Sequence, residues 1–246
     1  VMGWSRPGDM GFDIVHFNLH KSFSQPHGGG GPGAGPISVS DRIAPYLPVP
    51  RIVRHEGSNG ARPRFDLDHE GQKSIGRLRG FQGNFGVFVR SYAYISSLGG
   101  DGLKEASETA VLNANYLLAK LKEGRAGKHL PPAFGERCMH EFVLTGEPAR
   151  RELQVKTLDL AKRLLDFGFH PPTIYFPLLV EEALMFEPTE TETRESLDEL
   201  AAAIDRILAE AEEDPAIVRE APYTTPVRRL DEAAASRRPV VRQPVD

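Results

Sequence analysis

Short runs of large apolar residues along the chain predict β-strands. The run at 12–20 (FDIVHFNLH) alternates and carries several large apolar side chains, which is typical of a buried strand. Shorter runs of the same character occur at 36–40, 139–145 and 183–189. We therefore predict a strand at each of these places, with long stretches of different character between them.

Apolar residues at spacings of three and four positions predict helices between these strands. The segment 84–100 has the length of a helix and ends at two glycines. A second helix is expected at 102–124, with Asp101 as its N-cap. The segment 155–168 is amphipathic and ends at a glycine, so it predicts a third helix.

The last predicted helix begins near a capping box and ends near Glu213. Thr189 and Glu192 have the spacing of such a box, in which each side chain bonds the backbone N–H of the other residue. Apolar residues then recur with the period of a helix and predict its buried stripe: Leu197, Leu200, Ile204, Ile207 and Ala211.

Two segments show neither the alternation of a strand nor the spacing of a helix. The segment 41–79 is rich in Pro, Gly, Arg and His and predicts a long irregular connection, a kind of segment that is usually functional or linking. The segment 219–246 carries several prolines and arginines and predicts an extended arm. Strands and helices otherwise alternate, which indicates an α/β fold with a domain boundary near 90–100.

Composition and charge exclude several classes of protein. The chain has 246 residues, enough for one large domain or two small ones. A formal net charge of −4 gives no basic face for nucleic acid, and no apolar run approaches the length of a membrane span. The segment 1–10 lacks the pattern of a signal peptide, and the single cysteine, Cys138, permits no internal disulfide. We expect a cytoplasmic protein with neither nucleic acid nor membrane as a partner.

Lys21 stands at the predicted end of the first strand, shortly before a glycine-rich segment. A lysine whose pKa is lowered can form a Schiff base with an aldehyde cofactor, and glycines let the backbone approach a phosphate closely. His20 and Ser22 flank this lysine. A solvated lysine beside a flexible turn explains the same spacing, and from spacing alone it is the better interpretation.

The glycine-rich segment also matches G-x-G-x-x-G, from Gly28 to Gly33. That motif indicates a dinucleotide site when it opens a helix, and Pro32 and Pro36 oppose a helix start here. No Gly-Lys-Ser/Thr closes the loop, which excludes a P-loop. A nucleotide-binding module is therefore a poor interpretation of this segment.

Histidines near the lysine raise the question of a metal. His16 and His20 would share a face of the predicted strand, but no carboxylate or cysteine cluster joins them, so we expect no metal site. His140 and Glu141 would point to opposite faces of their strand, which makes them poor partners. His170 begins a rigid His-Pro-Pro corner that suggests the wall of a site or an interface.

Five long segments taken together resemble one family. They follow one another over nearly the whole chain: NLHKSFSQPHGGGGPGAGP, AVLNANYLLAKL, MHEFV, AKRLLDFGFHPPTIYFPL and ALMFEPTETE. The chain resembles the pyridoxal-phosphate subunit of glycine decarboxylase, the P-protein of the glycine cleavage system, and specifically the C-terminal half of subunit 2 in its split bacterial form. Another pyridoxal-phosphate enzyme, such as an aminotransferase, fits the glycine-rich loop and the FEPTETE segment less well.

This resemblance implies a fold and a cofactor. The fold would be fold-type I of the pyridoxal-phosphate enzymes, with 1–95 as the C-terminal part of the large domain, 96–218 as a small C-terminal α+β domain and 219–246 as an extended arm. Lys21 would be the catalytic lysine that binds pyridoxal 5′-phosphate, and His20 and Ser22 would help to position it. The glycine-rich loop would lie at the mouth of the site and His170 would belong to a family hallmark, which gives these further candidates: His27, Gly28, Gly29, Gly30, Gly31, Gly33 and His170.

The resemblance also implies an activity and its partners. Glycine would lose its carboxylate as carbon dioxide, and the aminomethyl group would pass to the lipoyl arm of the H-protein. P-protein subunit 1 would complete a heterodimer, and two heterodimers would pair. In the family, the aspartate that pairs with the pyridine nitrogen lies upstream of the position of Val1, so we expect a C-terminal fragment. The alternative is a truncated, non-catalytic remnant that only pairs with other P-protein subunits.

Overall fold

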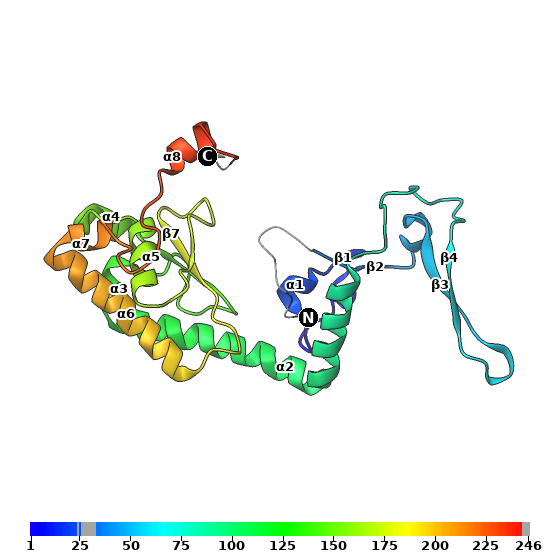
Figure 1. The fold of residues 1–246 in the computed structure, drawn as a ribbon. Coiled ribbons are helices and arrows are strands. Elements are labelled where there is room, and N and C mark those ends of the chain that lie inside the picture. The colour runs from blue at the N-terminus through cyan, green and yellow to red at the C-terminus, as the bar shows by residue number, and fades with distance from the viewer. Residues whose placement is uncertain (24, 26–32, 243–246) are drawn as a thin grey trace. The chain divides into compact units, whose positions relative to one another are not determined.

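The computed structural model describes residues 1–23, 25 and 33–242 of the chain. The chain divides into two compact units, an N-terminal unit of Val1–Glu105 and a C-terminal unit of Ala106–Asp246 (Figure 1). The division falls within a long helix, α2 in Figure 1. The domain limits that the resemblance implies stay a prediction.

Pairs of antiparallel strands and short helices make up most of the N-terminal unit. Strand β1 (Ile14–His16) pairs with β2 (Ile37–Val39), and β3 (Arg51–His55) pairs with β4 (Arg64–Asp68) as a hairpin. The first part of α2 (Phe85–Glu123) also belongs to this unit. The other helices described here are each one turn long: η1 (Pro7–Met10), α1 (Leu19–Ser22), η2 (Ala44–Tyr46) and η3 (Ser58–Gly60).

Two expectations for this unit are wrong in part. The strand predicted at 12–20 is present as β1 but covers three residues, because the chain leaves the β1–β2 ladder and turns into helix α1, which contains Lys21. It is not a buried strand, since Ile14 and His16 are exposed. The segment 41–79 is not irregular throughout, because it contains the β3–β4 hairpin. Charged residues within the hairpin form cross-strand ion pairs, such as Arg51 with Asp68, so a segment rich in arginine still forms strands.

Helix α2 contains a kink. Gly99 interrupts it with φ of 66° and ψ of −173°, a conformation that glycine adopts without steric cost. Asp101, the predicted N-cap of a separate helix, therefore lies inside α2. The helices expected at 84–100 and 102–124 are confirmed as two helical segments that meet at this kink, whereas the prediction of Asp101 as the N-cap is wrong.

A three-stranded antiparallel sheet belongs to the C-terminal unit. Its strand order is β5 (Phe142–Thr145), β7 (Ala183–Phe186), β6 (Thr173–Ile174), and β7 is the central strand. The strands predicted at 139–145 and 183–189 are confirmed with shorter bounds. The helices of this unit, besides the end of α2, are the following: α3 (Ala126–His129), α4 (Glu147–Leu153), α5 (Thr157–Asp166), α6 (Arg194–Glu213), α7 (Pro215–Arg219) and α8 (Glu232–Arg237).

The sheet and the helices of this unit share one apolar core. The predicted stripe of α6 is confirmed, because Leu197, Ile204, Ile207 and Ala211 are buried and Leu200 packs against them. Other large side chains that are fully buried come from α2, α5, α6 and the sheet: Leu117, Leu118, Leu144, Leu164, Leu184 and Leu208. The C-terminal unit therefore has a sequence pattern and a packed interior that agree with one another.

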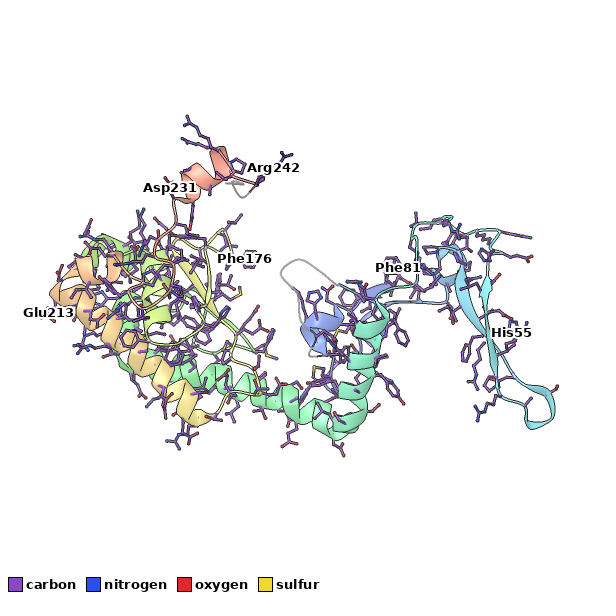
Figure 2. The ribbon with its side chains drawn as sticks, in the orientation of Figure 1. His55, Phe81, Phe176, Glu213, Asp231 and Arg242 are labelled. Carbon is purple, nitrogen blue, oxygen red and sulfur yellow. The ribbon has the colours of Figure 1, made fainter. Side chains whose placement is uncertain are left out.

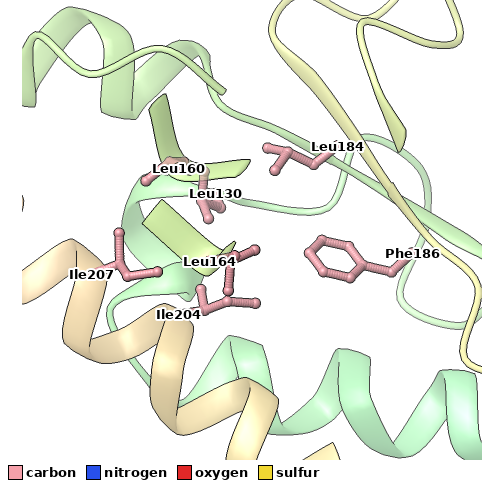
Figure 3. A pocket seen from close by; sticks show the side chains of 7 residues that line it. All are labelled: Leu130, Leu160, Leu164, Leu184, Phe186, Ile204 and Ile207. Atoms are coloured by element: carbon pink, nitrogen blue, oxygen red, sulfur yellow. The ribbon is translucent and has the colours of Figure 1, made fainter. Parts of the chain in front are cut away.

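A small void lies inside this core (Figure 3). Its volume is about 10 Å³. Such a void has room for about one water molecule, and its lining offers no polar partner: Leu130, Leu160, Leu164, Leu184, Phe186, Ile204 and Ile207. We interpret it as an imperfection of the core and not as a ligand site.

The start of α6 differs from the prediction. Thr193 is the N-cap, and its hydroxyl oxygen accepts a hydrogen bond from the N–H of Ser196 at 3.2 Å. Thr189 instead bonds Thr191 through its hydroxyl at 2.7 Å, while its carbonyl accepts the N–H of Glu192 in a turn. The predicted capping box at Thr189 is therefore wrong, because the hydroxyl needed for it is used within the turn.

Candidate functional site

Lys21 lies in α1, the single-turn helix that follows β1. Backbone hydrogen bonds join this turn to the chain that leads into β2. The N–H of Phe17 donates to the carbonyl of Pro36, and that of Leu19 donates to the carbonyl of Ala34, each at 3.1 Å. Leu19 is buried, whereas the Lys21 side chain is exposed. The amine is therefore accessible on a turn whose opposite side is anchored.

A histidine and a glycine determine how the chain enters α1. The ring Nε2 of His16 lies 2.8 Å from Oδ1 of Asn18, the N-cap residue of α1. A Cβ on Gly35 would lie 2.1 Å from Cε1 of His16 and 2.5 Å from the carbonyl oxygen of Phe17, so glycine is required there. His16 thus supports the local fold. Because His20 lies in α1, the expected sharing of one strand face by the two histidines is wrong.

The start of α2 is tied to the end of the glycine-rich segment. The side-chain amide of Asn84 donates to the carbonyl of Gly33 at 2.6 Å. This bond links residues that are far apart in sequence, and sequence patterns gave no sign of it. The remaining loop candidates lie outside the described residues, so their role stays a prediction: His27, Gly28, Gly29, Gly30 and Gly31.

His20, Lys21 and Ser22 are the predicted site residues that the structure brings together, because they are consecutive in α1. His20 and Ser22 are half-buried beside the exposed lysine. Together they offer an amine, an imidazole and a hydroxyl within one helical turn. Their roles in binding a cofactor stay predictions.

His170 belongs to the C-terminal unit and is exposed between α5 and β6. The two prolines that follow it are half-buried, and β6 begins directly after them at Thr173. The corner thus fixes the entry into the sheet, since each proline restricts its own φ and the residue before it. Its predicted role as the wall of a site stays a prediction.

The loop that follows β6 has unusual backbone at both ends. Tyr175 has φ of 58° and Glu182 has φ of 50°, a left-handed conformation that is uncommon for residues other than glycine. Figure 2 marks Phe176, which is exposed in this loop together with Leu178 and Leu179. Such conformations persist where surrounding contacts hold them, and burial raises the pKa of the Tyr175 phenol.

Glu182 is one of the contacts that hold this loop. Its Oε2 accepts hydrogen bonds from the N–H of Thr157 at 2.9 Å and from the hydroxyl of the same residue at 2.8 Å. The carboxylate therefore satisfies the first turn of α5, where an anion is favoured. Sequence reasoning missed this contact, because Glu182 belongs to an acidic run that reads as a solvated surface.

His140, Glu141 and Glu187 form an exposed cluster. The ring Nε2 of His140 lies 3.9 Å from Glu141 and 3.7 Å from Glu187, and one oxygen or nitrogen from each residue lies within 4.8 Å of the others. The prediction that His140 and Glu141 point apart is wrong, because β5 begins after them, at Phe142. An imidazole and two carboxylates suit a divalent cation, but exposed acidic groups also occur without one. The expectation that the chain has no metal site stays a prediction.

The side chain of Asn115 forms hydrogen bonds with the backbone of Cys138. The side-chain amide of Asn115 donates to the Cys138 carbonyl at 2.8 Å, and the N–H of Cys138 donates back to Oδ1 at 3.1 Å. Burial raises the pKa of the Cys138 thiol, which disfavours the reactive thiolate. These hydrogen bonds and the burial of Cys138 therefore give Asn115 and Cys138 a structural role.

Asp166 binds the start of the C-terminal arm. Its Oδ1 accepts hydrogen bonds from the N–H groups of Tyr223 and Thr224 at 2.7 and 2.8 Å, and Arg163 pairs with its other oxygen at 2.9 Å. Burial raises the pKa of Asp166, but the hydrogen bonds from Thr224, Tyr223 and Arg163 outweigh burial and lower it. The arm predicted as extended is thus bound to the core at its start and contains helix α8, so that prediction is wrong in part.

Comparisons with known proteins point to one family. The family model described as "Glycine dehydrogenase, C-terminal domain" matches residues 106–223. A relative from Desulforamulus reducens is 56% identical over 98% of this chain and 48% of its own length. One from Caldanaerobacter subterraneus subsp. tengcongensis is 57% identical over 98% of this chain and 47% of its own length. Both are named "Probable glycine dehydrogenase (decarboxylating) subunit 2". Residues 106–223 thus match the C-terminal domain of glycine dehydrogenase, and nearly the whole chain is similar to part of its subunit 2.

The match to this family has a defined extent. The chain spans about half the length of the curated glycine dehydrogenase relatives it matches. Among solved structures it resembles an inhibitor-bound glycine decarboxylase (P-protein) of the glycine cleavage system, with a TM-score of 0.68 and 23% identity over 83% of this chain and 45% of that one. This likeness confirms the α/β fold class. Within the described residues, none of the helices combines the length and apolar character needed to cross a membrane.

Proposed function

We propose that the chain carries the lysine-bearing part of a pyridoxal-phosphate-dependent glycine decarboxylase. The activity would be decarboxylation of glycine with transfer of the aminomethyl group to the lipoyl arm of an H-protein. The observation that carries this proposal is the 56% identity to the Desulforamulus reducens relative over 98% of the chain. The relatives' name, subunit 2, supports a partner subunit 1 and, through it, a pair of heterodimers.

The described residues fit the chemistry of this cofactor. Lys21 offers an exposed primary amine for the aldehyde group. The hydroxyl of Ser22 and backbone N–H groups near the glycine-rich segment are suitable donors to a phosphate. Pyridoxal phosphate supplies, when bound, an electron sink for the charge that glycine develops as carbon dioxide leaves.

The chain's own residues have separable roles in this proposal. Nζ of Lys21 would hold the cofactor and afterwards carry a proton to or from the substrate amine. His20 is half-buried beside it and would orient the lysine. The turn that presents Lys21 is anchored by Leu19 and by the bond from its N–H to Ala34, so the amine would return to one place in each cycle. A cytoplasmic location, which follows from the use of a single cysteine, is part of the proposal.

Reductive labelling tests the role of Lys21. The chain is mixed with pyridoxal phosphate, reduced with borohydride and mapped by peptide mass spectrometry. Lys21 should carry most of the label at low cofactor concentration, and Lys21→Ala should remove it. Lys73→Ala is the matched control, because Lys73 is an exposed lysine of the same unit and should leave the labelling unchanged.

The distribution of label decides the outcome. Equal labelling of Lys21 and Lys73 in a folded chain would contradict a specific site at Lys21. It would instead support a chain whose role is to pair with other subunits. The labelling needs neither glycine nor H-protein, so it tests the cofactor site separately from the whole reaction.

A further inference from the structure

The two faces of the β3–β4 hairpin differ in polarity. The register places Ile52 opposite Leu67 and Arg54 opposite Phe65, so these four side chains share one face. On this apolar face the exposed fractions are 60% for Ile52, 61% for Phe65 and 50% for Leu67. The hairpin, marked by His55 in Figure 2, therefore turns three large apolar side chains toward solvent.

The other face of the hairpin is charged and internally paired. Arg51 and Asp68 form an ion pair across the strands at 3.3 Å. His55 lies 3.6 Å from Asp66, which also pairs with Arg64. A hairpin in water normally exposes its charged face and covers its apolar one. The charged side chains here have their partners within the hairpin, whereas the apolar face lacks cover within the part of this unit that the structure describes.

Large apolar side chains elsewhere in the described part of the N-terminal unit are also exposed to solvent. Among its described residues, the apolar side chains that are buried are those of Leu19, Pro50 and Val87. Exposed large apolar side chains occur in several other elements, including Ile14 in β1, Ile37 in β2 and Phe85 in α2. An isolated two-stranded hairpin is at best marginally stable in water. The hairpin therefore needs an additional layer to become a stable part of a domain.

We propose that the apolar face of the β3–β4 hairpin, formed by Ile52, Phe65 and Leu67, binds the polypeptide that corresponds to the half of the relatives' length that this chain does not span. The relatives are about twice as long, since the match covers 48% and 47% of them. That length provides a layer of the same size as this chain. A second copy of the chain explains the exposed apolar side chains less well. A dimer formed through the hairpin alone would leave the apolar residues of the other elements exposed.

Co-purification tests this occupant. The tagged chain is co-expressed with an untagged polypeptide that contains the residues of the Desulforamulus reducens relative outside its match to this chain. The wild-type chain should retain that polypeptide in equimolar amount. The double variant Ile52→Glu/Leu67→Glu should retain at least about tenfold less, because two carboxylates would be buried in an apolar contact.

Val227→Glu is the matched control. Val227 is β-branched like Ile52 and has an exposed fraction of 62%, but it lies in the C-terminal unit. The control variant should retain the polypeptide as the wild type does. The C-terminal unit has its own core, so an unchanged urea unfolding transition shows that this unit is folded in each variant.

Cysteine labelling gives a second measurement that does not introduce charge. Leu67→Cys in a Cys138→Ser background should react rapidly with a maleimide in the chain alone. In the co-purified complex the rate should fall at least about tenfold, whereas Val227→Cys should react equally in both. Cys138 is the single natural cysteine, so the engineered thiol is the one that is followed.

Three results would overturn the proposal. The first is a soluble, folded wild-type chain that retains none of the polypeptide. The double variant could retain as much as the wild type. The chain alone could form dimers that the double variant abolishes, in analytical ultracentrifugation without the second polypeptide, which would make a second copy the occupant. None of these measurements uses the cofactor, so their failure is separate from failure of the proposed reaction.

Discussion

Among single residues, Asp166 carries the strongest prediction for stability. Its carboxylate receives the N–H groups of Tyr223 and Thr224 and pairs with Arg163, and its side chain is almost fully buried. Asp166→Asn should lower the free energy of unfolding by about 1–3 kcal/mol, because the N–H groups of Tyr223 and Thr224 lose an ionised acceptor and Arg163 is left with its pair to Glu210. Urea unfolding followed by circular dichroism measures the loss.

The same carboxylate makes this loss depend on pH. The pKa of Asp166 is lower in the folded chain than the value of about 3.9 for an unfolded aspartate. Its contribution is therefore complete above the unfolded pKa and is lost as the pH falls through the folded pKa. The difference between wild type and Asp166→Asn should shrink below about pH 4, and a difference that stays constant would contradict the assignment. Glu147→Gln, which breaks an exposed pair with Arg151, should cost less than about 1 kcal/mol.

At the scale of elements, the N-cap of α6 separates two interpretations of one sequence. Thr193→Ala should lower the free energy of unfolding by about 1 kcal/mol, because the N–H of Ser196 loses its acceptor. Thr189→Ala is the matched control and should cost less than about half as much, since its hydroxyl bonds Thr191 outside the helix. Equal losses of unfolding free energy for the two variants would contradict Thr193 as the N-cap and support the capping box at Thr189.

The elements also show what the sequence can predict. Helix α6 was predicted from Leu197, Ile204 and Ile207, because burial of one helix face imposes a period that is visible without any distant contact. The β3–β4 hairpin was missed because its alternate residues are arginine, histidine and aspartate, which read as loop composition. Alternation of polar and apolar residues within Arg64–Asp68 (RFDLD) was the signal that would have found it.

The candidate site shows what the sequence could not predict. The role of Lys21 stays a prediction, and the structure places this residue in helix α1, where the sequence predicted the end of a strand. Between the end of β1 and the start of α1, backbone N–H groups donate to the carbonyls of Ala34 and Pro36, which lie beyond the glycine-rich segment. A local pattern cannot show which distant carbonyl accepts a given N–H, so the turn that presents the lysine had to be observed.

For the whole molecule, the two units should differ in local stability. The C-terminal unit packs its sheet and helices around one core, whereas the described part of the N-terminal unit buries Leu19, Pro50 and Val87. Amides of β3 and β4 should therefore exchange with deuterium at least about a hundredfold faster than those of β7 and α6 in the chain alone, because opening of the hairpin exposes little further apolar surface.

Hydrogen exchange followed by mass spectrometry measures this contrast. Addition of the complementary polypeptide from the Desulforamulus reducens relative should slow exchange in β3 and β4 and leave α6 unchanged, because α6 already lies against a complete core. Strong protection of the hairpin in the chain alone would show that the N-terminal unit is stable without another layer. The apolar face would then need no occupant, and the exposed side chains of Ile52, Phe65 and Leu67 would be tolerated as an ordinary surface.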